Sequence, residues 1–284
     1  LFRSKIFIGS SIFSFLYGVV RTIFKENIYL IIAISPYTFF TFLLLTIFRK
    51  KIYVYLMSNG YEEYEYILGK NFKWIYGLMF KIVTKFSIVI VCHKRLFDPK
   101  KSHEITPSRL NNNWIKNCNL PNLDKPRLLY VGRINPEKGI DNFIKLFNKM
   151  NTDSELFIAG SAEKFKNTDH KIKSLGYISS EQELIRTYDH CNITILPSYT
   201  EAHPYVLEES LSRKRPIIIF EDIAYVKKNK KGVYIIKRDS YEIKEQIEWI
   251  LRNYQSIQKE MDQNDLPTMQ KMVKDRKSTR LNSS

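Results

Sequence analysis

Two acidic residues flank the start of a predicted helix in the second half of the chain, between buried-strand patterns at 192–196 and 216–220. Glu201 and Glu209 stand eight positions apart, and Pro204 lies between them. Proline suits the first helical turn, because its missing N–H would be unpaired there anyway. We therefore expect Glu201 in the loop and Glu209 on the helix. In an open parallel sheet such loops lie where ligands bind, and a helix N-terminus offers unpaired N–H groups to a phosphate.

Strand and helix patterns alternate through this half of the chain, which predicts an α/β fold with a doubly wound parallel sheet. The predicted strands are 128–131, 156–160, 192–196, 216–220 and 233–236, and the predicted helices are 140–147, 180–189 and 240–252, with Ser180 and Ser240 as caps.

A basic pair follows the first of these strands. Arg133 and Lys138 come after the strand pattern at 128–131. Arginine can hold phosphate oxygens with two parallel hydrogen bonds, and lysine acts as a point charge. Two solvated surface cations are the simpler interpretation of this pair alone, but the acidic pair nearby favours a phosphate site.

Two motifs resemble those of one enzyme family. The segment 197–209 resembles the Glu-x7-Glu motif of the retaining GT-B glycosyltransferases of family 4, the group 1 class, and the segment 130–139 is similar to that family's Gly-Arg…Lys-Gly segment. The resemblance covers residues 127–252 well and the first half mainly in its layout. It implies a GT-B fold, in which two Rossmann-like domains face a cleft, with the first domain incomplete here.

The resemblance implies roles for four side chains. Arg133 and Lys138 would bind the donor's diphosphate and stabilise the charge that develops on it as the glycosidic bond breaks. Glu209 would accept hydrogen bonds from both ribose hydroxyls, and Glu201 would contact the donor sugar. The alternative for Glu209 is a helix-surface acid paired with Arg213.

Further residues would line the same donor site. Tyr177 and Ile178, which follow a strand ending at Gly176, would form a base-binding edge, and Gly160 would let the backbone approach the ligand closely. Glu208 is expected to face elsewhere. Main-chain N–H groups of the loop and first helical turn would meet the sugar and phosphates; these residues are Ala202, His203, Pro204, Tyr205 and Val206. The alternatives are a His203 that only packs and a Gly160 that is an ordinary turn glycine.

No Asp-x-Asp segment occurs, and the five histidines show no ligand spacing. Metal-dependent GT-A enzymes hold a divalent ion with such a segment, whereas here Arg133, Lys138 and a helix dipole would replace the metal. We therefore expect no metal and no cofactor, with a nucleotide diphosphate sugar as the donor substrate.

The charge of the chain is strongly positive. The formal net charge is +16, of which residues 1–125 contribute +11. This excess favours contact with anionic lipid headgroups or an acidic acceptor. The alternative is the composition of an AT-rich genome, in which lysine is common. No nucleic-acid-binding module appears. Three scattered cysteines favour a reducing cytosol, so we expect a cytoplasmic protein, peripheral at the inner face of the plasma membrane.

Residues 28–48 carry no charge and are long enough to span a bilayer. Pro36 breaks this stretch, so we expect a strand at 28–34 and a helix at 37–48, followed by a strand at 52–56. A membrane-spanning helix is the alternative. Beyond it, a helical stretch is predicted over 61–85.

The domain organisation follows from these patterns. We expect an incomplete acceptor-side domain at 1–120, a linker at 121–126 and a nucleotide-sugar-binding domain at 127–274. Residues 275–284 resemble a non-native tail, and the chain is expected to be a fragment truncated at both ends.

Together these features predict a retaining, metal-independent glycosyltransferase of the hexosyltransferase type, acting on a glycan or lipid-linked acceptor in bacterial surface polysaccharide synthesis. Many relatives carry a first-domain histidine that faces the donor sugar, whereas residues 56–60 contain none. The alternative is therefore a non-catalytic GT-B-like subunit that holds a partner enzyme at the membrane.

Overall fold

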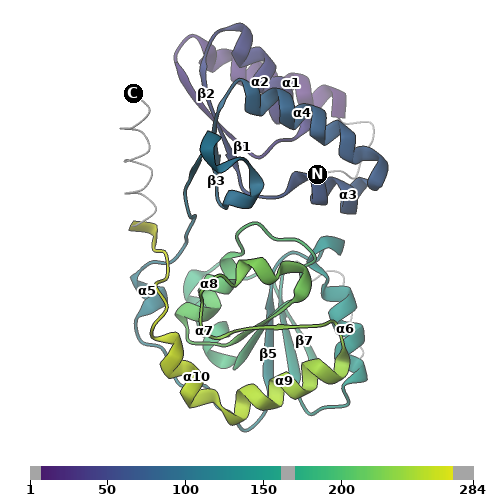
Figure 1. The fold of residues 1–284 in the computed structure, drawn as a ribbon, viewed down its shortest axis with the longest axis vertical. Coiled ribbons are helices and arrows are strands. Elements are labelled where there is room, and N and C mark those ends of the chain that lie inside the picture. Colours follow the sequence, from purple (N-terminus) through teal and green to yellow (C-terminus); the bar gives the residue numbers. More distant parts are fainter. Residues whose placement is uncertain (1–7, 161–169, 271–284) are drawn as a thin grey trace. The chain divides into compact units, whose positions relative to one another are not determined.

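The computed structural model describes residues 8–160 and 170–270, and Figure 1 labels their helices and strands. Contacts divide the chain into two compact units, Leu1–Thr106 and Pro107–Ser284. Each unit has its own parallel sheet with flanking helices. The predicted non-native tail at 275–284 lies outside the described residues.

The first unit contains a four-stranded parallel sheet whose spatial order follows the chain. Ile28 is level with Lys51, and Tyr53 is level with Ile88, so all the strands begin at one edge of the sheet. The strands are β1 (Ile28–Ile32), β2 (Lys51–Leu56), β3 (Ile88–Val91) and β4 (Ser102–Glu104).

Residues 28–48 form a strand and a helix, as predicted. Helix α2 (Pro36–Ile47) begins at the proline, and Ser35 caps it. The Ser35 hydroxyl accepts from the Thr38 N–H, and the Ser35 N–H donates to the Thr38 hydroxyl at 2.7 Å. This reciprocal cap fixes the start of α2 and separates it from β1. Within the described parts of the chain, no helix combines the length and apolar character needed to cross a bilayer.

The single helical stretch predicted over 61–85 is wrong, because the structure has two helices there. Helix α3 (Gly60–Leu68) ends at Gly69, whose φ of 94° lies outside the helical region. The short 3-10 helix η1 (Lys70–Phe72) then leads into α4 (Lys73–Lys85). Glycine adopts such a φ without a steric penalty, so Gly69 is the residue that permits the break.

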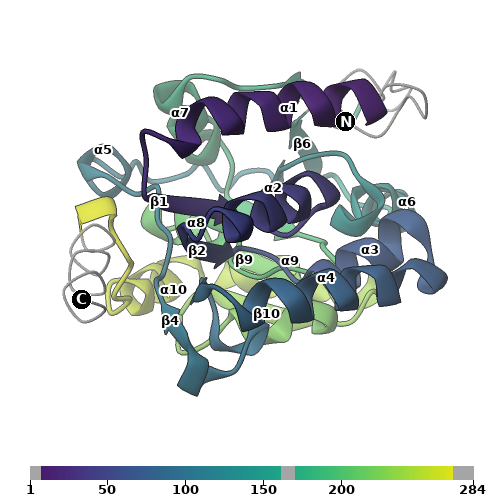
Figure 2. The same ribbon diagram turned by 90° about the horizontal axis from the view of Figure 1, so that it is seen from above.

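One face of the first sheet is covered by neighbouring helices. Helix α1 (Ile8–Ile23) contacts α2, and α2 contacts α4, as Figure 2 shows. Ile31, Val54 and Val89 lie on the covered face and are buried against Leu45 and Met79. Two short 3-10 helices, η2 (Lys94–Leu96) and η3 (Pro99–Lys101), precede β4.

The second unit contains the predicted doubly wound parallel sheet, with six strands in the order β10-β9-β8-β5-β6-β7. Five strands match the predicted positions, and β7 ends at Gly176 as expected. They are β5 (Arg127–Val131), β6 (Glu155–Ala159), β7 (Ile172–Gly176), β8 (Ile193–Leu196), β9 (Ile217–Phe220) and β10 (Val233–Ile236).

Helices flank these strands (Figure 1), and two of their predicted starts need correction. Pro204 is the residue before helix α8 and not part of its first turn. Asp239, and not Ser240, caps α9, because its carboxylate accepts from the Tyr241 and Glu242 N–H groups. The helices are α5 (Asn112–Ile115), η4 (Pro136–Lys138), α6 (Ile140–Lys149), α7 (Glu181–His190), α8 (Tyr205–Ser212), η6 (Glu221–Val226), α9 (Ser240–Arg252) and α10 (Tyr254–Met261).

The segment predicted as a linker, 121–126, lies inside the second unit. The chain enters this unit at Pro107, well before the first strand. Trp114 is 2% exposed, and its ring meets that of Tyr188 at 5.7 Å between centroids. A large aromatic side chain buried before β5 therefore ties residues 107–126 to the second unit.

Candidate functional site

The strand order of the second unit reverses beside β5. This strand pairs with β6 on one side and with β8 on the other, although β8 comes three strands later in the chain. The loop after β5 carries Arg133 and Lys138, and the loop after β8 carries Glu201. The carboxyl ends of parallel strands share one edge, so the two loops meet there, at the point where doubly wound sheets bind ligands.

A cavity of about 630 Å³ lies at this point. All but one of the positions that the sequence predicts for the donor site line it, and the exception is Ala202. The predicted residues that line it are Arg133, Lys138, Gly160, Tyr177, Ile178, Glu201, His203, Pro204, Tyr205, Val206 and Glu209. A cavity of this size suits a ligand as large as a nucleotide.

Lys138 and Glu201 form the closest ion pair in the cavity wall. Lys138 Nζ lies 2.6 Å from Glu201 Oε1, and the Ser198 hydroxyl donates to the same oxygen at 2.7 Å. Their side chains are only 19% and 11% exposed, so the pair is partly shielded from solvent. It joins the loop after β5 to the loop after β8.

A glycine lets these two loops approach each other. Gly139 has a φ of 65°, and a Cβ atom there would lie 2.1 Å from the Pro197 carbonyl oxygen. The Tyr199 N–H also donates to the Glu137 carbonyl at 2.9 Å. Only glycine combines this backbone conformation with room for the neighbouring carbonyl. The Lys-Gly sequence therefore has a structural as well as a chemical basis.

Arg133 has a fixed main chain and an accessible guanidinium. The Tyr130 hydroxyl, in a residue that is 1% exposed, donates to the Arg133 carbonyl at 2.6 Å. The Arg133 side chain is 71% exposed, and its Nη2 lies 4.0 Å from Glu137 Oε1. Arg133 can therefore turn towards an anion in the cavity, whereas Lys138 already contacts a carboxylate.

Glu209 is buried in the cavity wall and is not a helix-surface acid. It is 5% exposed, and its Oε2 accepts from the Tyr188 hydroxyl at 2.9 Å. Burial raises the pKa of Glu209, although the hydrogen bond from Tyr188 and the charge of Arg109 act in the opposite direction. The alternative pairing with Arg213 is wrong, because that residue contacts Asp189 instead.

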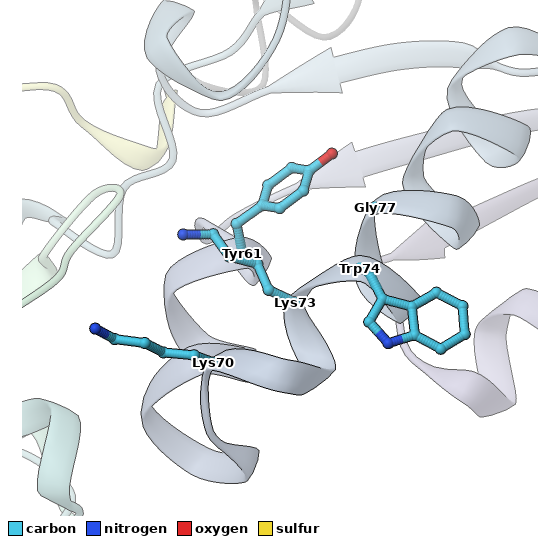
Figure 3. A pocket seen from close by; sticks show the side chains of 5 residues that line it. All are labelled: Tyr61, Lys70, Lys73, Trp74 and Gly77. Atoms are coloured by element: carbon cyan, nitrogen blue, oxygen red, sulfur yellow. The ribbon is translucent and has the colours of Figure 1, made fainter.

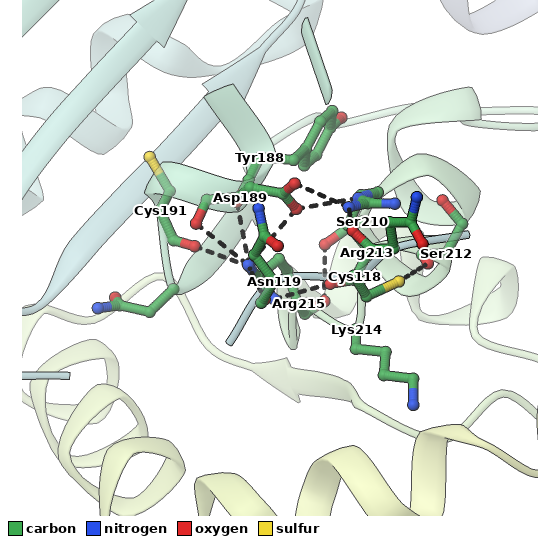
Figure 4. Close-up of polar contacts among 12 residues, drawn as sticks. Cys118, Asn119, Tyr188, Asp189, Cys191, Ser210, Ser212, Arg213, Lys214 and Arg215 are labelled. Atoms are coloured by element: carbon green, nitrogen blue, oxygen red, sulfur yellow. Dashed lines mark hydrogen bonds and ion pairs between the residues drawn. The ribbon is translucent and has the colours of Figure 1, made fainter. Parts of the chain in front are cut away.

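Two buried arginines fix the end of the helix that carries Glu209 (Figure 4). Arg213 and Arg215 are each 1% exposed. Arg213 donates to both oxygens of Asp189, at 2.9 and 2.7 Å. It also donates to the main-chain carbonyls of Trp114, Lys116 and Asn117. Arg215 donates to the carbonyls of Tyr188 and Cys191. These bonds hold α7 and α8 together and so set the position of Glu209 relative to Tyr188.

His203 packs against Glu208, which, as expected, does not line the cavity. Its Nε2 lies 3.0 Å from Glu208 Oε1, and the two side chains are 10% and 2% exposed. Neither carboxylate oxygen of Glu208 accepts a hydrogen bond of good geometry from any described residue. A buried carboxylate without a partner is costly in free energy. The His203 imidazole, 3.0 Å away, is placed to offset this cost.

The other predicted positions lie at the ends of β6 and β7. A Cβ atom on Gly160 would lie 2.2 Å from the Gly132 carbonyl oxygen, so this glycine permits close approach of two loops as well as lining the cavity. Tyr177, which is 81% exposed, and Ile178 follow Gly176, whose φ is 70°. An exposed ring at the cavity rim offers a flat apolar surface to a planar ligand.

Sequence reasoning missed one cation of this site. Arg109 lines the cavity, and its guanidinium carbon lies 4.6 Å from the centroid of the Tyr205 ring. Its neighbours are fixed, because the Ser108 hydroxyl donates to the Pro267 carbonyl and Leu110 is fully buried. Arg109 lies in a segment without apolar periodicity, so the sequence gives no sign that it reaches the cavity. Its position follows only from the packing of Ser108 and Leu110.

The same arrangement occurs in known proteins. The family model described as Glycosyl transferases group 1 matches residues 113–265, which is more than half of the chain. The chain belongs to the glycosyl transferases group 1 family. The matched residues include Arg133, Lys138, Glu201 and Glu209, so most of the cavity wall lies within the part of the chain that the family model matches.

Individual relatives agree with the family assignment. An uncharacterized glycosyltransferase of Haemophilus influenzae is 30% identical over 150 residues, which cover 49% of this chain and 41% of that protein. The chain thus spans less than half the length of this relative.

Solved structures share the fold over most of the chain. Sucrose-phosphate synthase of Thermosynechococcus elongatus matches with a TM-score of 0.75 at 15% identity, over 99% of this chain and 79% of that one. Alr3699/HepE of Anabaena, solved with UDP and glucose, matches with a TM-score of 0.67 at 12% identity, over 91% of this chain and 77% of that one. These similarities confirm the GT-B α/β fold predicted from the sequence.

No group of three or more metal-binding side chains comes together in the part of the chain that the structure describes. Three cations and two carboxylates are among the groups that line the cavity, and so are the first two residues of α8. This set can hold an anionic, hydroxyl-rich ligand through charge-assisted hydrogen bonds.

Proposed function

We propose that the second unit binds a nucleotide diphosphate sugar, and that the whole protein transfers this sugar with retention of configuration and without a metal. The observation that carries the proposal is the cavity of about 630 Å³ that collects Arg133, Lys138, Glu201 and Glu209. The fold alone would support many functions, so these side chains carry the argument.

Each side chain has a distinct place in the proposed reaction. Arg133 and Lys138 hold the diphosphate, Glu209 accepts from the ribose hydroxyls, and Glu201 contacts the donor sugar. Tyr177 and Ile178 form the edge that meets the base. The first N–H groups of α8 would donate to the same diphosphate.

The bond that breaks joins the anomeric carbon to the diphosphate oxygen. The acceptor hydroxyl oxygen forms the new bond on the same face of the sugar, and its proton moves to the leaving diphosphate. No protein nucleophile is needed in this scheme. Fixed cations lower the barrier because the negative charge of the diphosphate increases in the transition state.

The acceptor in this proposal is a glycan or a lipid-linked sugar of bacterial surface polysaccharide synthesis. The protein would then work in the cytoplasm, peripheral to the inner face of the plasma membrane. The basic excess of residues 1–125 supports this location, because anionic lipids attract such segments.

Isothermal titration of the chain with UDP and with GDP tests the donor site. We expect one of the two to bind, and the variants Arg133→Ala and Glu209→Ala to weaken binding about tenfold to a hundredfold, as expected for lost charge-assisted hydrogen bonds. Arg252→Ala, which removes an exposed cation at the end of α9, is the matched control and should bind as the wild type does. No binding of either nucleotide would favour a non-catalytic subunit instead.

A further inference from the structure

The edge of the first sheet at which its strands begin receives the ends of three helices. Helix α1 leads into β1, α2 leads into β2, and α4 leads into β3. The strands are parallel and in register, so these three helix ends lie side by side. A hydrogen bond joins the chain segments that follow α1 and α2, because the Lys51 N–H donates to the Asn27 carbonyl at 3.0 Å. The ends of these two helices are therefore neighbours.

Each of these helix ends exposes a large apolar side chain. Phe24 is 83% exposed, Ile47 is 75% exposed and Phe86 is 60% exposed. Phe48 is 43% exposed, and its ring meets that of Phe24 edge-on at 6.1 Å between centroids. Single exposed apolar residues are normal on a protein surface. Four of them along one sheet edge form a patch, and such patches mark interaction sites.

Cations border these apolar side chains. Two acids, Glu26 and Asp98, lie in the same turns, and Asp98 is 3.9 Å from Lys101. Cations near helix C-termini offset the helix dipole, and this explains some of the positive charge at this edge. It does not explain the exposed aromatic rings there. The cations are Lys25, Arg49, Lys50, Lys51, Lys85, Lys100 and Lys101, of which the last two stand in η3 before β4.

We propose that this basic apolar edge, formed by Phe24, Ile47, Phe48, Phe86 and the seven cations around them, docks on an anionic lipid membrane. Apolar rings bury into the headgroup boundary, and Lys and Arg side chains attract anionic lipids. The inference deepens the peripheral membrane contact proposed above, because it names the surface and the charge of the lipid. It does not depend on the donor site of the second unit.

A second exposed surface of the first unit offers a natural comparison (Figure 3). A shallow hollow is lined by Tyr61, Lys70, Lys73, Trp74 and Gly77. Lys73 Nζ lies 2.8 Å from a Glu65 carboxylate oxygen, which offsets its charge, and Trp74 and Lys70 point in opposite directions. This surface therefore lacks the combination of clustered rings and surplus cations that the basic apolar edge has.

Docking by this edge would orient the first unit. Ligands of parallel sheets bind beyond the carboxyl ends of the strands, which is the edge opposite to the basic apolar edge. Strand β2 has six residues, so the two edges are about 20 Å apart. The ligand-binding edge would thus face away from the bilayer. This orientation favours an acceptor glycan that extends from the membrane over one whose reacting hydroxyl lies among the headgroups.

Vesicle co-sedimentation of the chain tests the inference. We expect binding to vesicles of equal parts phosphatidylcholine and phosphatidylglycerol, and little binding to phosphatidylcholine alone. The double variant Phe24→Ser with Phe48→Ser should weaken this binding by at least roughly tenfold. The double variant Arg49→Gln with Lys51→Gln should weaken it about 25-fold, at roughly fivefold for each cation.

Trp74→Ser with Leu78→Ser is the matched control, because these residues of α4 are 68% and 53% exposed but lie outside the basic apolar edge. It should sediment as the wild type does. The inference would be overturned if the chain bound both kinds of vesicle equally or bound neither. It would also be overturned if only the control variant lost binding to the anionic vesicles. Circular dichroism confirms that each variant is folded. UDP titration of the same variants separates this result from a failure of the donor site, because none of the changes touches the cavity.

Discussion

Lys138 Nζ and Glu201 Oε1 lie 2.6 Å apart and connect the two loops that form the cavity. The pair has two consequences for binding. It holds Glu201 in the cavity wall before a ligand arrives, and it offsets the charge of Lys138 that a diphosphate would otherwise meet. A donor that binds here must therefore share Lys138 with Glu201.

The first prediction concerns Glu201→Gln. The amide keeps the shape of the side chain but removes its charge, so Lys138 becomes fully available to an anion. We expect the affinity for UDP to stay the same or to rise a few-fold. The additional affinity for a UDP-sugar over UDP should disappear, because the contact with the sugar is weakened. Titration of both ligands against the wild type and the variant checks this. A large loss of UDP affinity would contradict the proposed role of Glu201.

The second prediction concerns pH. Glu209 can accept from two ribose hydroxyls only as a carboxylate, and burial raises its pKa above 4.5. Nucleotide affinity should therefore fall as the pH drops through this raised pKa. Tyr188→Phe removes the hydrogen bond that lowers the pKa of Glu209, so the loss of affinity should begin at a higher pH.

The matched control for this pH measurement is Tyr254→Phe. Its hydroxyl donates to the Asn192 carbonyl at 2.7 Å, and it does not line the cavity. We expect its pH profile to follow that of the wild type. Identical profiles for Tyr188→Phe and the wild type would show that the hydrogen bond to Glu209 does not govern nucleotide binding.

The third prediction concerns Arg109, whose guanidinium carbon lies 4.6 Å from the Tyr205 ring centroid. An arginine held by its neighbours beside Glu209 adds a third cation to the cavity. We expect Arg109→Ala to weaken UDP binding about tenfold, and Arg109→Lys to restore only part of it, because lysine lacks the planar group that stacks on tyrosine. Calorimetry measures both variants. Unchanged affinity in Arg109→Ala would remove this residue from the site.

The fourth prediction concerns the glycine between the two loops. Gly139→Ala adds a Cβ atom 2.1 Å from the Pro197 carbonyl oxygen, at a φ of 65°. We expect it to lower the free energy of unfolding of the second unit by about 2–4 kcal/mol, from backbone strain plus overpacking. Gly176→Ala has a φ of 70° but no atom within 4 Å of the new Cβ, so it should cost only about 1–2 kcal/mol. Denaturant unfolding of both variants measures the difference, and equal costs would contradict the steric argument.

Much of the second unit could be predicted from the sequence because five of its six strands are short, mainly apolar runs followed by a loop with polar or glycine residues. The cavity followed from two motifs, since parallel strands bring the loops after β5 and β8 to the same edge. The burial of Glu209 did not follow. A glutamate with an arginine four positions later is the pattern of a surface ion pair. Only the three-dimensional structure shows that Arg213 pairs with Asp189 instead.

Other misses have similar physical causes. The break at Gly69 interrupts a helical periodicity that continues on both sides, so the apolar pattern does not show it. The place of Arg109 at the cavity and the burial of Glu208 did not follow from the sequence, because tertiary packing, and not local pattern, determines both. Local patterns report which element forms, whereas the partner of a buried charge depends on segments far apart in the chain.

A crystal structure of the chain with UDP would test the central claim most directly. The account predicts density in the cavity, with phosphate oxygens within hydrogen-bond distance of Arg133 and Lys138 and ribose hydroxyls at Glu209. UDP bound elsewhere on the chain, with these three side chains free of contact, would contradict it.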